Sequence, residues 1–472
     1  MKKPERLVGF VEYEATQFPF EFDESSFSIF LYPPDKKALD GCANPIRFFS
    51  SSTKTAQEHE WVQQKRLLGT TSEKYQIVFD IQDSPSNYHG FISFQVNWYL
   101  YFRNVDINSV IGFRITGNVV NYFYPPETAI KAEIEFNENG RNVKKIAVNS
   151  TEYKKVSCGE YRVSDKIDAT IEAAAYASIH YDNALSPIEA TSILTMGFSA
   201  PVGLDVLLNS YDNTRLFFEY ITYRHNVILG DVEVLFLNRQ EKKEYGGVLV
   251  FPAEFAEESN KKVKQRIIKY SLLTTKAAKL FNAINNNAFE FQSICGSIGE
   301  TNRYSSSRII MIFTEFEREY RNIFGQDFGR SDEYLETKQA VVDLIDQYEK
   351  SQHGKRRRYA NQLKNYVDKR DSSFEANIKK ALTDCEPILS GFARKRYEES
   401  YPVVVDGIAE RMGIIRNGIA HSHIDLYFDA VHLSDIKIIE ELIYAMRLKE
   451  IGLTDEECQK AINDLFGENF GL

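Results

Sequence analysis

Up to about residue 200, apolar and polar positions tend to alternate, which is the side-chain period of a β-strand. The clearest alternating segments are rich in β-branched and aromatic residues and cover residues 27–32, 75–79, 90–102 and 132–136. Turn-forming sequences such as Pro33-Pro34-Asp35 and Asn139-Gly140 separate them. Because little helical spacing lies between these segments, we expect antiparallel sheets, arranged as a sandwich or a distorted barrel.

Farther along the chain the apolar spacing changes to three and four residues. A first helix is predicted from Pro201, followed by a strand at residues 232–236. Beyond the polar run at residues 257–262, helices are predicted at residues 308–324, 333–350, 403–420 and 434–450, with a short last helix capped near Thr454. The predicted fold is therefore α+β and multidomain, with a β-rich domain over residues 1–258 and an α-helical bundle of about five to seven helices over residues 262–472.

Length and composition fit this division. The chain has 472 residues, enough for two or three domains, and its 43% hydrophobic content is typical of a globular protein. The five cysteines are widely spaced and form no C-x-x-C pair, which favours a reducing compartment over a disulfide framework or a zinc site. The first residues lack a signal-peptide pattern, and no apolar run reaches the length of a membrane helix. We expect a cytoplasmic protein without membrane contact.

Charge is distributed unevenly. The net charge of −10 disfavours a nucleic-acid partner for the molecule as a whole, but residues 351–400 hold twelve Lys and Arg against seven Asp and Glu. The densest basic run is Lys355, Arg356, Arg357 and Arg358. It is predicted to follow an RNA backbone, with a solvated loop or helix start as the alternative.

The strongest candidate for chemistry is the sequence Arg416-Asn417-Gly418-Ile419-Ala420-His421, at the carboxyl end of the helix at residues 403–420. Asn417 and His421 are four residues apart, which places them on one helical face. His423 is a second choice for the histidine. The alternative is purely structural: Arg416 interacts with the helix end and His421 lies in a turn.

These residue types suit the cleavage of RNA, whose 2′-hydroxyl supplies the nucleophile. His421 can transfer a proton near neutral pH, and Arg416 offers a charged planar fork for phosphate oxygens. Asn417 can position the phosphate or the sugar. No metal or other cofactor is required. The sequence has no G-x-S-x-G, H-E-x-x-H or phosphate-loop pattern, so serine hydrolases, zinc proteases and NTPases gain no support.

The Arg416-Asn417-x-x-x-His421 motif, at the end of a helix in a carboxyl-terminal bundle, resembles the HEPN superfamily of ribonucleases. A β-rich region before such a bundle, together with the stretch at residues 438–453 (IIEELIYAMRLKEIGL), resembles the ApeA type of bacterial anti-phage protein. Arg416 and His421 match the defining positions of the motif, and Asn417 matches its polar position.

This resemblance implies a metal-independent endoribonuclease that acts in abortive infection after a phage-derived trigger. It also implies a homodimer or higher homo-oligomer, in which two Arg/His motifs form one composite site, and a β-rich domain that senses or regulates. An acidic residue on an earlier helix often supports such sites. Glu317 is our candidate and Glu315 the second, with simple surface exposure as the alternative for both.

A function of another class also fits the sequence. In this alternative the protein is a non-catalytic sensor, whose helical domain serves for dimerisation and whose β-rich domain binds a phage protein or another ligand. The acidic net charge and the many aromatic residues of the β-rich part motivate it. A cluster of these aromatic residues lines either a ligand groove or the core: Trp98, Tyr99, Tyr101, Phe102, Tyr122, Phe123 and Tyr124.

Overall fold

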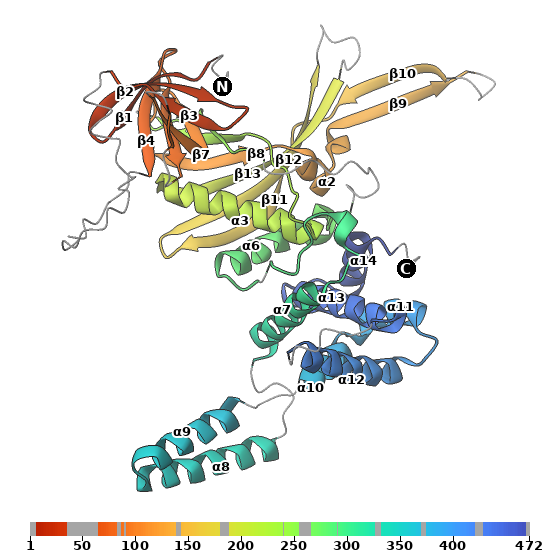
Figure 1. Cartoon of the computed structure of the whole chain (residues 1–472). Helices are drawn as coiled ribbons and strands as arrows, with labels where there is room; N and C mark the ends of the chain where they lie inside the picture. Colours follow the sequence, from red (N-terminus) through yellow and green to blue (C-terminus); the bar gives the residue numbers. More distant parts are fainter. Residues whose placement is uncertain are drawn as a thin grey trace, which may run out of the picture. The chain divides into compact units, whose positions relative to one another are not determined.

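The computed structural model describes residues 6–34, 65–82, 86–88, 91–137, 143–179, 188–238, 240–253, 266–289, 291–325, 332–369, 374–420 and 428–468. Antiparallel strands come first and helices follow, which confirms the predicted α+β class (Figure 1). The chain divides into two compact units: Met1–Asp212 with Val227–Glu257, and Asn213–Asn226 with Glu258–Leu472. The second unit thus takes a short segment from within the range predicted to be β-rich. Within the described ranges, none of the helices has the length and apolar character needed to cross a membrane.

The first unit is built mainly from one large antiparallel sheet. Its strands are Val8–Tyr13 (β1), Thr16–Asp23 (β2), Ser28–Leu31 (β3), Arg66–Thr71 (β4), Gln76–Ile81 (β5), Ser86–Tyr88 (β6), Phe91–Phe102 (β7), Val110–Ile115 (β8), Lys155–Ser164 (β11), Ile167–Ile179 (β12), Ile188–Val202 (β13), Val232–Leu237 (β14) and Lys243–Val250 (β15). The order is β11-β12-β13-β8-β14-β15-β7-β3-β2-β1-β4-β5, and β5 also pairs with β7. The six strands from β7 to β5 therefore close a barrel. Ile130–Phe136 (β9) and Val143–Ser150 (β10) form a separate two-stranded ribbon.

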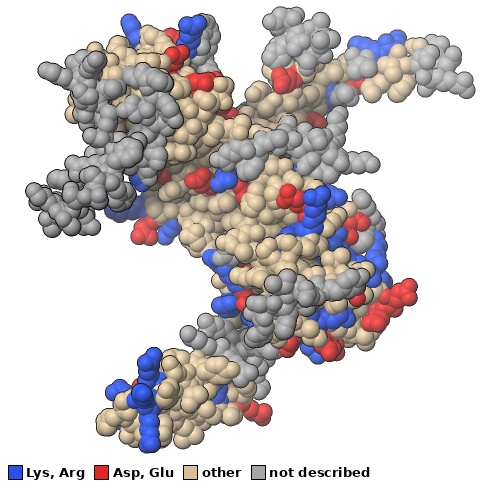
Figure 2. All heavy atoms as spheres, viewed as in Figure 1, with Lys and Arg blue, Asp and Glu red and all other residues tan. Residues whose placement is uncertain are grey.

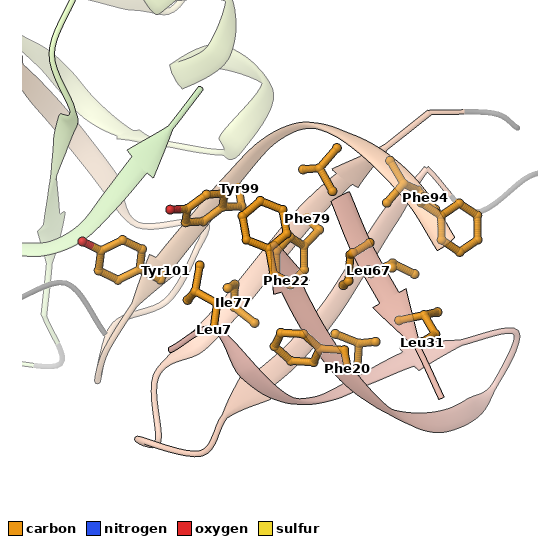
Figure 3. Packing of buried hydrophobic residues seen from close by; sticks show 14 of the residues in the cluster. Leu7, Phe20, Phe22, Leu31, Leu67, Ile77, Phe79, Phe94, Tyr99 and Tyr101 are labelled. Carbon is orange, nitrogen blue, oxygen red and sulfur yellow. The ribbon is translucent and has the colours of Figure 1, made fainter. Parts of the chain in front are cut away.

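The barrel encloses an aromatic core (Figure 3). Alternate residues of each strand point inward, as in β2, where Phe18, Phe20 and Phe22 are buried. The ring of Phe22 lies 5.3 Å from that of Phe79 and 5.0 Å from that of Tyr99, centre to centre. Most of the aromatic cluster singled out in the sequence is likewise buried, so these residues belong to the core and not to a ligand groove: Trp98, Tyr99, Tyr101, Phe102 and Phe123.

Strand β7 belongs to two parts of the sheet. Its first half pairs with β3, from Ile92 to Gln95. Its second half pairs with β5 on one edge and with β15 on the other, where Tyr99 to Phe102 are opposite Val250 to Gly247. The strand therefore links the barrel to the open sheet.

The helices that begin in the first unit depart from the predicted pattern. The first was predicted from Pro201, but the helix Leu204–Thr222 (α3) starts three residues later because β13 continues through Val202. A short helix, Asn118–Phe123 (α2), was not predicted, and its six residues are too few to show a helical period.

The described part of the second unit contains the ten α-helices α5 to α14, more than the predicted five to seven. They are Tyr270–Leu273 (α5), Ala277–Asn285 (α6), Ser306–Phe324 (α7), Asp332–Ser351 (α8), Gly354–Lys369 (α9), Phe374–Asp384 (α10), Glu386–Arg396 (α11), Tyr401–Ala420 (α12), Ala430–Glu450 (α13) and Asp455–Phe466 (α14). The helices predicted from apolar spacing are confirmed at α7, α8, α12, α13 and α14. Thr454 caps α14 through a capping box with Glu457. Helix α13 starts at Ala430 and not at Ser434, because Asp429 accepts hydrogen bonds from the Val431 and His432 backbone N–H groups.

Helix α13 is the central helix of the second unit. Apart from Lys437, its residues from Asp435 to Leu448 are buried. Charged residues within this stretch form ion pairs with side chains on α7, α11 and α12. The pairs are Arg411–Asp435, Arg308–Glu440, Arg396–Glu441 and Arg447–Glu319. Such pairing offsets the cost of burying each charge.

Candidate functional site

Helix α12 carries the predicted catalytic segment. Val404, Ile408, Met412 and Ile415 are buried along one stripe, as their spacing predicted. Ile419 is only half-buried, so the last turn is less enclosed than the rest of the helix. The core contact of this stripe determines which side of the last turn remains accessible.

Arg416, in that last turn, joins α12 to two other helices. Its Nη2 atom lies 2.9 Å from Oε1 of Glu317 on α7. Its guanidinium carbon lies 5.3 Å from the centre of the Phe374 ring, at the start of α10, in cation–π geometry. The Arg416 side chain is 42% exposed and that of Glu317 is 24% exposed. The structure thus brings together Arg416 and the acidic residue predicted to support it.

A second arginine also approaches Glu317. Nη2 of Arg321, one turn along α7, lies 3.6 Å from Glu317 Oε2. The carboxylate therefore holds two guanidinium groups at a partly exposed surface. Because arginine stays charged at any physiological pH, this surface carries a net positive charge from these three groups.

Of the remaining motif residues, the structure describes Asn417 but not the two candidate histidines. Asn417 is exposed at the end of α12. His421 and the alternative His423 lie outside the described residues, since the description of α12 ends at Ala420. The shared face of Asn417 and His421 stays a prediction.

Glu315, the second acidic candidate, does not face this surface. It is buried, and the Ser293 hydroxyl donates a hydrogen bond to its carboxylate. Burial raises the pKa of Glu315 well above its ordinary value. We therefore assign Glu315 to the core and retain Glu317.

The basic run Lys355, Arg356, Arg357 and Arg358 forms the first turn of α9. All four side chains are exposed, in keeping with either phosphate contact or simple solvation. Arg357 Nε lies 3.5 Å from Glu349 Oε1 on α8, so one member of the run is partly neutralised. Figure 2 shows Lys and Arg side chains on the α8–α9 hairpin beside a broad surface without charged groups.

Phe374 is the contact of this site that sequence patterns could not indicate. It lies 42 positions before Arg416 in the chain, and its buried position is that of an ordinary core residue. Only the packing of α10 against α12 places its ring beneath the guanidinium group. Among the described residues, no group of three or more His, Cys, Asp and Glu side chains is arranged to hold a metal ion.

The described part of the site has a defined chemical capacity. Arg416 is fixed by Glu317 and Phe374, yet it keeps exposed N–H groups that can donate to phosphate oxygens. Comparison with protein-family models, curated proteins and solved structures finds no match to this chain.

Proposed function

We propose that the protein is a metal-independent endoribonuclease of an anti-phage, abortive-infection system. Arg416 and His421 carry the chemistry, Asn417 positions the phosphate or sugar, and Glu317 orients Arg416. The observation that carries this proposal is the ion pair between Arg416 and Glu317, because it unites the motif arginine with an acidic residue of another helix at an accessible surface.

The proposed reaction uses the nucleophile of the substrate. The 2′-oxygen attacks the adjacent phosphorus atom, the bond to the 5′-oxygen breaks, and a 2′,3′-cyclic phosphate forms. The proton that leaves the 2′-hydroxyl passes through His421 to the departing 5′-oxygen, and Arg416 stabilises the charge that develops on the phosphate oxygens. Motifs from two copies of the chain form one composite site, and the run Lys355 to Arg358 binds the RNA backbone.

The first test is RNA cleavage by purified full-length variants. H421A and R416A should each lower the cleavage rate by roughly 100-fold or more, the usual contribution of a proton-transferring or charge-stabilising group. E317Q should weaken cleavage less, because it loosens Arg416 without removing it. R321A is the matched control, since Arg321 also contacts Glu317 but is not assigned to the reaction.

Two further readings complete this test. Wild-type activity should persist in excess chelator, and helical content should be the same in all variants. If H421A and H423A both cut RNA at the wild-type rate, the proposed chemistry is wrong. In infected bacteria, H421A should also abolish growth arrest.

The alternative function is a non-catalytic sensor whose helical domain only dimerises. It is motivated by the large first unit, which unites a barrel and an open sheet. If the purified wild-type chain cuts no cellular RNA even with phage extract present, this alternative is favoured.

A further inference from the structure

The α8–α9 hairpin exposes an unusually apolar face. Each helix contributes three exposed residues, with their exposed fractions as follows: Val341 39%, Leu344 64% and Tyr348 51% on α8, and Tyr359 57%, Leu363 60% and Tyr366 59% on α9. Within each helix these residues are three and four positions apart, so each set forms one stripe. Isolated apolar side chains at a surface are ordinary, but two complete stripes on one hairpin indicate an interaction surface.

The two stripes lie on the same face of the hairpin. Val342 and Ala360 are buried where the helices meet. Each stripe includes the residue just before the buried one, which is Val341 on α8 and Tyr359 on α9. One residue corresponds to a rotation of about 100° around the helix axis, so each stripe is turned by about this angle from the contact between the helices. Since the helices run in opposite directions, the same rotation turns both stripes to the same side.

The two stripes are also level with each other. Two ion pairs set the register of the hairpin: Glu349 with Arg357, at 3.5 Å, and Asp346 with Lys364, at 2.7 Å. In this register, residues opposite each other on α8 and α9 have the same height along the helix axes to within one helical turn. The stripes accordingly form three layers: Tyr348 with Tyr359, Leu344 with Leu363, and Val341 with Tyr366.

Charge differs between the two helices. Helix α8 has six acidic and two basic residues, a net charge of −4. Helix α9 has six basic and one acidic residue, a net charge of +5. A hairpin with one acidic and one basic helix is complementary to itself when a two-fold axis places α8 of one copy over α9 of the other.

We propose that this apolar face binds the same face of a second copy of the chain, forming a four-helix bundle in which α8 of each copy packs against α9 of the other. In this bundle Leu344 faces the partner's Leu363. Three of the six residues are tyrosines, whose rings can stack on bases, but the net charge of −4 on α8 would repel phosphate, which favours a second copy over RNA. The association does not depend on the proposed nuclease activity.

Sedimentation of the full-length chain tests the surface. We expect L344E/L363E to lose one association step, so that its mass falls about two-fold relative to wild type at the same concentration. Leu68→Glu is the matched control, because Leu68 is 54% exposed on β4 in the first unit and should leave the mass unchanged. An unchanged mass for L344E/L363E overturns the proposal. A loss of RNA affinity at unchanged mass would assign the face to RNA instead and would equally overturn it.

Disulfide trapping tests the arrangement without disturbing folding. A mixture of Leu344→Cys chains and Leu363→Cys chains should form a mixed disulfide dimer, whereas Leu344→Cys chains alone should not. The wild-type chain measures the background, since its described cysteines, Cys158, Cys295, Cys385 and Cys458, are buried. Efficient linkage of Leu344→Cys to itself, or no linkage in the mixture, contradicts the proposed packing of α8 against α9. R416A chains should associate like wild type, which separates this result from the fate of the proposed nuclease site.

Discussion

Two glutamates that are two positions apart on α7 have opposite roles. Two residues along a helix are separated by about 200°, so Glu315 and Glu317 face opposite sides. Glu317 reaches the surface and pairs with Arg416, while Glu315 is buried beside Ser293. Helical geometry alone therefore gives two identical side chains different environments.

This difference predicts a pH-dependent stability. Burial, together with the charges of Glu319 and Glu440, raises the pKa of Glu315. The folded chain thus holds this proton more tightly than the unfolded chain, and the resulting stabilisation is lost as pH rises from the unfolded pKa of about 4.3 through the folded pKa. Relative to E315Q, the wild type should therefore lose free energy of unfolding as pH rises above about 5.

Urea unfolding across this pH range measures the effect. E317Q is the control, because it removes a carboxylate from the same helix at a partly exposed position. A wild-type protein that gains stability over E315Q as pH rises would show that Glu315 is charged in the folded state.

The site was only partly predictable at the level of single residues. The resemblance implied an acidic residue on an earlier helix, and its first candidate, Glu317, lies beside Arg416 in the structure. Phe374 could not be found, since nothing in its own segment distinguishes a core phenylalanine from one that stacks on Arg416. His421 lies outside the described residues, and its role remains a prediction.

At the level of elements, α13 shows the limit of periodicity. The spacing of apolar residues predicted the helix, but it did not indicate the environment of Asp435, Glu440 and Glu441. In the structure all three are buried and pair with arginines of other helices. These arginines precede the acidic residues they pair with by between 24 and 132 positions, so no local pattern reveals them.

Removing one of these arginines should be strongly destabilising. R308M leaves the Glu440 carboxylate buried with only the hydroxyl groups of Tyr223 and Tyr304 as partners. The expected loss is about 3–5 kcal/mol of free energy of unfolding. Urea unfolding of the full-length chain, followed by its helical circular dichroism, measures this loss. The double variant R308M/E440Q should recover part of it. R321M is the matched surface control, because Arg321 is 58% exposed. If R308M and R321M are equally stable, the Arg308–Glu440 ion pair does not stabilise the fold.

At the level of the whole molecule, the division between units does not follow a single cut in the sequence. Asn213–Asn226 belongs to the second unit although it precedes β14 and β15 of the first. Within the second unit, Phe217 stacks on Phe281 at 4.4 Å and Tyr220 on Tyr444 at 4.6 Å, centre to centre. The change of apolar period near residue 260 could predict the boundary where the chain enters the second unit for the last time. It could not predict the inserted segment Asn213–Asn226, whose pattern is simply that of a helix.

Fragments should reflect this arrangement. A fragment of residues 262–472 lacks the rings of Phe217 and Tyr220, which fill the core against Phe281 and Tyr444. It should therefore be less helical and more sensitive to protease than the same fragment fused to residues 213–226. Circular dichroism and limited proteolysis compare the two, with the fusion carrying F217S/Y220S as the control for added length. Equal protection of both fragments would mean that the segment is dispensable for folding.

The position of β7 bears on how the first unit comes apart. Between Tyr99 and Phe102 the strand is hydrogen-bonded on both edges, to β5 of the barrel and to β15 of the open sheet. If the barrel opens at this point, the open sheet loses the support of a strand that is also one of its own. If the open sheet separates here, the barrel loses that support in the same way. Partial unfolding of either part is therefore penalised by the other, and the barrel and the open sheet are expected to unfold cooperatively as one block.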